Sequence, residues 1–325
     1  MLLFTPGCYL ASSQINIMKA IQLNEYGPAT NLKPVTVDKP AFAANQVLIK
    51  IKASAVNPVD VKVRAGTMAR VMPKTLPTIL GSEAAGMVEE TGSDVKRLKK
   101  GDEVYTMPNF FSGGTYAEYV SVNENEVALK PASLSFVQAA AVPVGAGTAY
   151  TAIIKTANMQ PGQKILIHGA AGAVGSFAVQ IAKIKGAYVI GTASGAGINI
   201  IKSIGADEVI DYTKTNFSTA VKDMDVVLDL VGGETLMKSF TVIKKGGLLI
   251  STVMPPPADK AAAAGIKAQM IQTQPDAVML TEIATWIDEG KIKTQAPIVL
   301  KLDQAQQAHE MIENKTAKGK LVFEM

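Results

Sequence analysis

The chain has 325 residues, 48% of them hydrophobic and 18% charged, which is typical of a globular protein with one large core or two. Lys and Arg outnumber Asp and Glu by only 32 to 28 and are scattered along the chain, so a nucleic-acid partner is not expected. The single cysteine, Cys8, excludes an internal disulfide and favours a reducing, cytoplasmic location.

Residues 1–17, MLLFTPGCYLASSQINI, are an apolar, uncharged leader in front of a second natural start at Met18. The leader lacks the basic region of a secretory signal and is shorter than the roughly 20 apolar residues of a spanning helix. We interpret it as an upstream start or a vector-derived remnant, expect it to be disordered, and leave it out of the fold prediction. No other apolar run reaches membrane length, so no membrane partner is predicted.

The rest of the chain is predicted to form three segments that differ in secondary structure. Residues 18–134 are predicted to be mainly β, since short segments such as VLIKIKA alternate in polarity between Gly, Pro and Asn. In residues 135–274, helix-compatible stretches alternate with apolar runs such as KILIHGA and DVVLDLVG, which predicts βαβ units and a parallel sheet covered on both faces. Residues 275–325 are mixed, with a helix through Trp286, a strand at APIVLKL, a helix from Gln304 to Asn314 and a closing strand, GKLVFEM.

The first βα junction of the middle segment carries a dinucleotide fingerprint. A predicted strand, Lys164 to His168, runs into Ala170-x-Gly172-x-x-Gly175 and then a helix. Gly172 allows close approach of a pyrophosphate, and Gly175 allows tight packing of helix on strand. The helix N-terminus, with Ala173 and Val174, offers free N–H groups to the phosphates. His168 is interpreted as a packing residue.

The end of the second strand of this segment favours NADPH over NADH. An NAD site carries an acidic residue here, but the tip reads Ala193, Ser194, Gly195 and Ala196. Without a carboxylate to repel it, a 2′-phosphate can accept a hydrogen bond from Ser194. Positive charge is expected from Lys202 or Lys214, and Tyr212 either donates a further hydrogen bond or packs on the sheet.

From Met18 to its end the chain resembles the medium-chain dehydrogenase/reductase superfamily, and within it the zinc-free quinone oxidoreductase and enone (alkenal) reductase branch. The resemblance rests on NPVDVKVRAG, LPTILGSEAAGMVEETGSDV, GGTYAEYV, AAAVPVGAGTAYTAI, PGQKILIHGAAGAVGSFAVQIAK, GADEVIDY and DVVLDLVGG. It implies an α/β fold in which a GroES-like β-rich catalytic domain, residues 18–134 and 275–325, is split around a Rossmann doubly wound parallel-sheet domain, residues 135–274. It also implies an active cleft between the two domains and a homodimer formed by Rossmann sheet edges.

The chain differs from the zinc-dependent branch of this superfamily at the metal site. The Gly-His-Glu stretch of that branch reads Gly81-Ser82-Glu83 here, and its cysteine is replaced within SAVNPVD. Zinc needs three protein ligands around an open position, and His168, His309 and Cys8 cannot assemble them. No metal is therefore predicted, and Ser82 and Glu83 are expected to be structural.

Hydride transfer to an electron-poor acceptor does not require a metal. The resemblance places the Asn57 turn beside the nicotinamide, so the Asn57 amide is the candidate donor to a developing oxyanion, the alternative being a helix cap. Thr148 is similarly expected near the nicotinamide ring. Asp60 and Lys62 are predicted to form a surface pair, and Tyr116 to shape a turn.

The cofactor and substrate are expected to contact loops at the domain junction. Val231 and Val253, which follow the last Rossmann strands, are assigned to cofactor binding. The MPNFF loop, residues 107–111, and the TVMPPP loop are assigned to an apolar substrate pocket that contains Asn109, Phe110 and Met254.

The predicted function is NADPH-dependent, zinc-independent reduction of a small-molecule quinone or α,β-unsaturated carbonyl compound. An enoyl-thioester reductase of the same superfamily is the enzymatic alternative. A non-catalytic NADPH-binding sensor is the other alternative, and it predicts cofactor binding without turnover.

Overall fold

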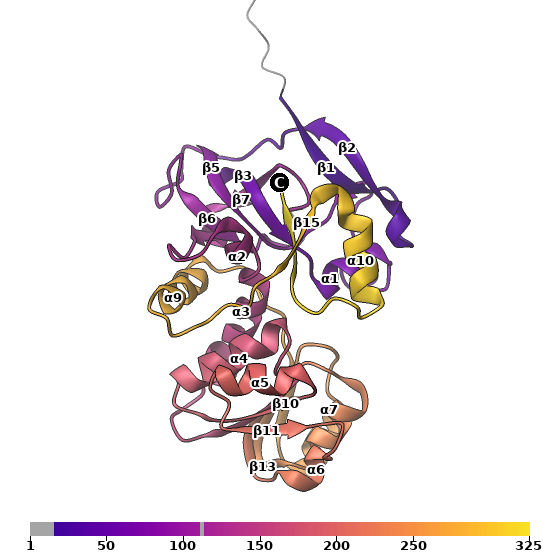
Figure 1. The fold of residues 1–325 in the computed structure, drawn as a ribbon, viewed down its shortest axis with the longest axis vertical. Helices are drawn as coiled ribbons and strands as arrows, with labels where there is room; N and C mark the ends of the chain where they lie inside the picture. Colours follow the sequence, from indigo (N-terminus) through magenta and orange to yellow (C-terminus); the bar gives the residue numbers. More distant parts are fainter. Residues whose placement is uncertain (1–15, 111–113) are drawn as a thin grey trace, which may run out of the picture.

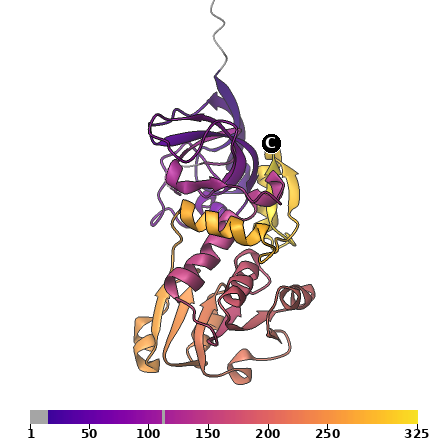
Figure 2. The ribbon, with the colours of Figure 1, turned by 90° about the vertical axis from the view of Figure 1, so that its left-hand side faces the viewer.

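The structure is a computed structural model that describes residues 16–110 and 114–325. The expectations for the leader up to residue 15, Cys8 included, and for Phe111 lie outside these residues. Figure 1 shows an elongated molecule with a β-rich lobe at one end and a parallel sheet at the other. Helices α3 (Pro143–Tyr150) and α9 (Ala277–Asp288) lie between the two lobes, as the perpendicular view in Figure 2 also shows.

The lower lobe in Figure 1 is built on a six-stranded sheet whose neighbours are all parallel. Its order is β11 (Glu208–Asp211), β10 (Tyr188–Ala193), β9 (Lys164–His168), β12 (Met224–Asp229), β13 (Ile243–Ser251) and β14 (Lys267–Met270). The chain begins in the middle at β9, winds outward to β11, and then returns to the other side at β12. This order creates a switch point between β9 and β12, where ligands bind in open α/β sheets.

Helices cover both faces of the parallel sheet. One face packs on α3, α4 (Ala173–Ile184) and α5 (Ala196–Ser203), and the other packs on α6 (Phe217–Ala220), α7 (Gly233–Ser239) and α8 (Ala258–Ala264). Successive side chains of β9 alternate between these two cores, with Ile165 and Ile167 on the first face and Leu166 on the second. The central strand β9 is therefore apolar on both sides, and helices on both faces confirm the predicted doubly wound sheet.

The upper lobe contains two further sheets. The larger has the order β15 (Ile298–Lys301), β16 (Leu321–Glu324), β3 (Gln46–Ala55), β5 (Ala84–Thr91), β6 (Glu103–Thr106) and β8 (Val127–Leu129), with β7 (Tyr119–Asn123) also on β3. The smaller has the order β2 (Leu32–Asp38), β1 (Ile17–Leu23) and β4 (Thr78–Ile79). Because β16 runs antiparallel to β3, with Val322 opposite Ala55, the end of the chain lies beside the segment that follows β3.

Short helices complete the β-rich lobe and its connection to the parallel sheet. They are α1 (Pro58–Arg64), α2 (Phe136–Ala140), α10 (Ala305–Glu313), the 3-10 turns η1 (Ala29–Asn31), η2 (Glu124–Glu126) and η4 (Leu302–Gln304), and a π-helical segment, η3 (Thr151–Thr156). None of the helices in residues 16–110 and 114–325 is long and apolar enough to cross a bilayer.

The predicted α/β fold with a split GroES-like part is confirmed, and β9 has the bounds that were predicted for it. The boundaries at residues 134/135 and 274/275 stay predictions. One hydrophobic core contains residues from all three predicted segments and so extends across both boundaries. A hydrogen bond also crosses them, since the Tyr105 hydroxyl, in β6, donates to the carbonyl of Leu280, in α9, at 2.5 Å.

Candidate functional site

The turn between β9 and α4 shows why two of its glycines differ in role. A Cβ on Gly175 would lie 2.3 Å from the Gly169 carbonyl oxygen and 2.6 Å from the Ala170 Cα, so packing alone demands glycine there. A Cβ on Gly172 would meet only the Gly169 oxygen, at 3.3 Å. Gly172 is also exposed. A Cβ at Gly172 requires a smaller shift of its neighbours than one at Gly175, so packing demands glycine less strongly at Gly172, and we expect close approach of a ligand to be the further reason.

The exposed side of this turn fits a dinucleotide. Gly172 caps α4, Ala173 is exposed and Val174 is half-buried, so the free N–H groups of the first helical turn lie near the surface. A Cβ on Gly169 would lie 3.4 Å from Val231, which follows β12 and is 53% exposed. Val253, which follows β13, packs against Gly232. The predicted cofactor residues therefore gather around the switch point of the sheet.

The two residues predicted to recognise a 2′-phosphate lie together. The Ser194 hydroxyl, after β10, donates to the Tyr212 hydroxyl, after β11, at 2.7 Å. Tyr212 is 59% exposed, so its ring does not pack on the sheet. Lys214 is exposed and lies 3.7 Å from Asp211. Lys214 lines the groove described next, whereas Lys202, on α5, does not.

A groove of about 660 Å³ opens at the carboxyl ends of β9, β10 and β12. Its lining includes His168, Thr192, Tyr212, Phe217 and Val231. The volume lies in the range of small-molecule sites, roughly 300 to 1,000 Å³. His168 is buried against Phe217, and its ring nitrogens contact the hydroxyls of Thr192 and Ser239 at 3.3 Å and 3.1 Å. Burial lowers the pKa of His168 to about 4, so a neutral imidazole forms part of the groove's inner wall.

A second group of polar residues, which we call the Glu83 cluster, is buried in the β-rich lobe. It comprises Asn57, Asp60, Ser82, Glu83 and Lys320. The Asn57 amide donates to Ser82 Oγ at 3.0 Å and to Glu83 Oε1 at 2.9 Å, and its oxygen accepts from Lys320 Nζ. Lys320 Nζ also lies 2.5 Å from Glu83 Oε1, a carboxylate with no exposed surface. An ammonium group thus neutralises the buried glutamate.

Asp60 is part of this cluster, so the predicted surface pair with Lys62 is wrong. Asp60 is only 2% exposed, and its Oδ2 accepts from the Asn57 backbone N–H at 2.8 Å and from the hydroxyls of Tyr116 and Ser82 at 3.2 Å and 3.3 Å. Asp60 is the third residue of α1, and its carboxylate folds back to cap the helix N-terminus. Burial raises the pKa of Asp60 to about 6, although Lys320 opposes the shift.

Tyr116 does more than shape a turn, because its hydroxyl also contacts Asp60. The hydroxyl has one proton and donates it to Asp60, so it accepts from Nε2 of His309, 3.3 Å away. His309 is fully buried on α10, and burial lowers its pKa to about 3, which keeps the ring neutral. Its Nδ1 has no hydrogen-bond partner within the described part of the chain.

Helix α3 connects the Glu83 cluster to the cofactor turn. The second carboxylate oxygen of Glu83 accepts from the Val144 backbone N–H at 2.7 Å, at the start of α3. One residue later, a Cβ on Gly145 would lie 2.9 Å from the carbonyl oxygen of Ala173, so α3 touches the first turn of α4. Thr148 lies further along α3, where its hydroxyl donates to the Val144 carbonyl at 2.7 Å. The geometry thus joins the two candidate catalytic residues, Asn57 and Thr148, through one helix.

The proposed roles of Asn57 and Thr148 stay predictions. Both N–H groups of the Asn57 amide are donated to protein atoms, so donation to a substrate requires exchange of one of these bonds. The Thr148 hydroxyl also accepts from Thr273 at 3.2 Å.

The predicted substrate residues come from both lobes. The Asn109 backbone N–H donates to Glu126 at 3.0 Å, and the Phe110 ring lies 4.4 Å from the ammonium of Lys74. Met254, 40% exposed, follows β13, and its sulfur lies 3.5 Å from the backbone nitrogen of Gly233. Their assignment to one pocket stays a prediction.

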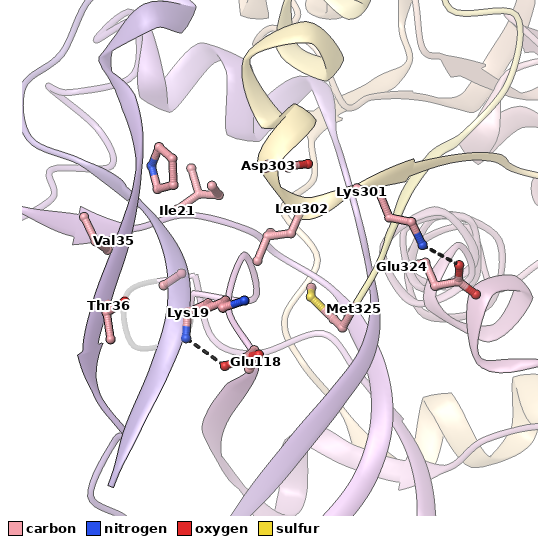
Figure 3. Close-up of a pocket in the computed structure, with 12 residues that line it drawn as sticks. Lys19, Ile21, Val35, Thr36, Glu118, Lys301, Leu302, Asp303, Glu324 and Met325 are labelled. Carbon is pink, nitrogen blue, oxygen red and sulfur yellow. Dashed lines mark hydrogen bonds and ion pairs between the residues drawn. The ribbon is translucent and has the colours of Figure 1, made fainter. Parts of the chain in front are cut away.

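Another cavity, of about 560 Å³, lies far from these residues at the outer end of the β-rich lobe, between β1, β2 and the end of the chain (Figure 3). The backbone N–H of Lys19 donates to Glu118 at 2.7 Å, and Lys301 pairs with Glu324 at 3.2 Å. None of the predicted site residues lines it. The active site at the junction of the lobes stays a prediction.

Comparison with known families gives two matches along the chain. Residues 43–132 match an alcohol dehydrogenase GroES-like domain, and residues 204–323 match a family described as zinc-binding dehydrogenase. Over residues 16–110 and 114–325, no group of three or more His, Cys, Asp or Glu side chains is placed to hold a metal ion.

Individual proteins match over nearly the whole chain. The 2-methylene-furan-3-one reductase of Solanum lycopersicum is 39% identical over 94% of this chain and 79% of its own length. The chloroplastic NADPH-dependent alkenal/one oxidoreductase of Arabidopsis thaliana is 36% identical over the same shares. The structure of the quinone oxidoreductase from Coxiella burnetii superposes with a TM-score of 0.87, at 35% identity, over 95% of this chain and 99% of that one. The chloroplast location of one relative leaves a cytoplasmic location as a prediction.

The contrast between Gly172 and Gly175 predicts two different defects. Gly175→Ala should destabilise the protein by about 1 to 3 kcal/mol, because its Cβ overlaps the backbone of Gly169 and Ala170. Gly172→Ala should leave the melting temperature within a few degrees of wild type but weaken NADPH binding roughly tenfold or more. Thermal denaturation and titration calorimetry test the pair, and equal NADPH affinity of Gly172→Ala and wild type would contradict the assignment.

The raised pKa of Asp60 predicts how the unfolding free energy depends on pH. Its pKa rises from 3.8 to about 6 on folding, so the native state binds the proton more tightly between these values. The unfolding free energy of wild type should therefore fall as pH rises through this window, whereas Asp60→Asn has no such contribution. Between pH 4.5 and pH 7.5, the unfolding free energy of the variant minus that of wild type should rise by about 2 kcal/mol in urea titrations. A constant difference would show that Asp60 has an ordinary pKa.

Proposed function

This chain belongs to the medium-chain dehydrogenase/reductase superfamily, among its quinone and alkenal oxidoreductases, and we propose that it reduces quinones or α,β-unsaturated carbonyl compounds with NADPH. The observation that carries the proposal is the carboxyl edge of the parallel sheet. The Gly172 turn, the exposed first turn of α4, and the paired hydroxyls of Ser194 and Tyr212 follow strands of this sheet, and Tyr212 also lines the groove.

Each part of this carboxyl edge has a distinct task in binding NADPH. The N-terminus of α4, with Ala173 and Val174, holds the pyrophosphate through backbone N–H groups. The hydroxyls of Ser194 and Tyr212 donate to the 2′-phosphate, with Lys214 as the nearby cation. Val231 and Val253 give the dinucleotide apolar contacts at the ends of β12 and β13.

The bound cofactor supplies a hydride, and the protein's own residues orient the acceptor that receives it. Thr148, on α3, lies between the cofactor turn and the Glu83 cluster and positions the reactive ring. Phe110 and Met254 give an apolar acceptor a surface on either side of the junction. A conjugated acceptor spreads the incoming charge onto its oxygen, so the reaction needs donors but no metal.

We also propose a zinc-independent mechanism and a homodimer. In the place of a metal-binding histidine this chain has Ser82, which donates to Asp60. Among the described strands, β14 pairs with β13 alone, so its outer edge is available to β14 of a second copy. Met270, on this edge, is 44% exposed.

A substrate panel tests the proposed function. Purified protein should oxidise NADPH, followed at 340 nm, when mixed with quinones, alkenals or enones, and the rate should survive a chelator. Faster turnover of a crotonyl thioester than of free enones would favour the enoyl-thioester alternative. Tight NADPH binding with no turnover of any acceptor would favour a sensor and contradict the proposal.

A single substitution tests the choice of NADPH over NADH. Ser194→Asp should weaken NADPH binding by about 10 to 100-fold and strengthen NADH binding, because its carboxylate repels the 2′-phosphate and accepts from a free ribose hydroxyl. Ser203→Asp, on the exposed end of α5, is the control for an added charge nearby. If Ser194→Asp leaves the ratio of the two affinities unchanged, Ser194 does not face the ribose.

A further inference from the structure

Resting on the proposed function, we infer that the ammonium of Lys320 holds the acceptor's oxygen and stabilises the negative charge that develops there during hydride transfer. Lys320 is the last residue before β16, and it reaches the active site because β16 pairs with β3. It lies 263 residues from Asn57, whose amide oxygen accepts from its Nζ.

The hydrogen-bond donors of the Glu83 cluster are nearly all used. The Asn57 amide donates to Ser82 and Glu83, and the hydroxyls of Ser82 and Tyr116 both donate to Asp60. These groups have no proton left for a substrate without breaking a buried bond. Breaking such a bond leaves a polar atom unpaired, which is costly in a buried site.

Lys320 differs because an ammonium has three N–H donors. One faces Asn57 Oδ1 and a second faces Glu83 Oε1. The third has no partner among the residues that the structure describes. The Lys320 side chain is 10% exposed, whereas that of Glu83 is fully buried, so Lys320 is the more exposed residue of the pair.

The charge of the Glu83 cluster also indicates Lys320 as the group that stabilises the oxyanion. Two buried carboxylates, Asp60 and Glu83, share this cluster with a single ammonium. A substrate oxyanion that formed beside the carboxylates alone would be repelled by both. Lys320 is held in place by Glu83 and Asn57, so its charge is oriented before the reaction begins, which is what makes such stabilisation effective.

For an enone, Lys320 assists the transfer of a hydride to the carbon–carbon double bond. The β-carbon receives a hydride from the reduced nicotinamide, which is oxidised, and a new C–H bond forms. The electron pair of the C=C bond shifts, and the carbonyl oxygen becomes an enolate oxygen that accepts the third N–H of Lys320. The α-carbon then takes up one proton from water, and the product is the saturated ketone.

The experiment must separate this role from simple neutralisation of Glu83, since removal of one partner of a buried ion pair is destabilising. Lys320→Met alone leaves Glu83 unpaired and is expected to be destabilised for that reason. The double variant Lys320→Met/Glu83→Gln removes both charges and keeps the volume filled. The matched control is Lys301→Met/Glu324→Gln, which removes an exposed Lys–Glu pair from the neighbouring strands β15 and β16.

We expect the Lys320/Glu83 double variant to fold and to bind NADPH within about threefold of wild type. Its kcat for enones should fall about 100 to 1,000-fold, the scale seen when a preorganised oxyanion donor is removed. Lys320→Arg should retain more activity than the double variant, and Lys301→Met/Glu324→Gln should match wild type. If the Lys320/Glu83 variant turns over at a rate near wild type, Lys320 only neutralises Glu83 and the inference is wrong.

A binding measurement gives a readout besides turnover. 4-Nitrophenolate, whose oxygen resembles that of an enolate, should bind to wild type and to the control at least tenfold more tightly than to the Lys320/Glu83 variant. Its visible absorbance reports the ionised form. Equal binding by all three proteins, or no binding by wild type, would overturn the inference. If wild type reduces no acceptor at all, the proposed function fails first, and the role of Lys320 fails with it.

Discussion

The carboxylate of Glu83 is the interaction on which the site depends. One oxygen accepts from Asn57 and pairs with Lys320, and the other accepts from the backbone of Val144. Three segments that are far apart in the chain meet at this group: the start of α1, the start of α3 and the start of β16. Because the carboxylate is fully buried, it must be paired in this way to be tolerated.

The two lobes divide the work in a manner that follows from their sheets. A parallel sheet presents the carboxyl ends of its strands and the N-termini of its helices at one edge, which suits a dinucleotide. The antiparallel pairing of β16 with β3 in the β-rich lobe makes Lys320 and Asn57 neighbours. Helix α3 contacts both lobes and connects the Glu83 cluster to the turn between β9 and α4.

Local sequence patterns predicted the β9–α4 unit well. The limits of β9 and the order of strand, turn and helix around Gly172 depend on a short segment with strong periodicity. The fingerprint spans only a few residues, and its geometry is set by the backbone of one βα unit. Such features are accessible without knowledge of tertiary contacts.

The Glu83 cluster could not be predicted in the same way. Asp60 carried a usable signal, because Asn57-Pro58 followed by an acid at the third helical position is a capping pattern, which predicts its bond to the Asn57 backbone N–H. Lys320 carried none, since its partners lie 237 and 263 residues away and its pairing depends on the register of β16 on β3. Lysine on a chain terminus is usually solvated, so only the fold shows that this one is buried.

The central claim is that a hydride passes from NADPH to a conjugated carbon without a metal ion. The most direct test supplies NADPH with deuterium at the reactive C4 position, an enone and chelator-treated protein, and locates the label in the product by NMR. The account predicts deuterium on the β-carbon of a saturated ketone. Deuterium on the carbonyl carbon of an allylic alcohol, or transfer that occurs only after zinc is added, would contradict it.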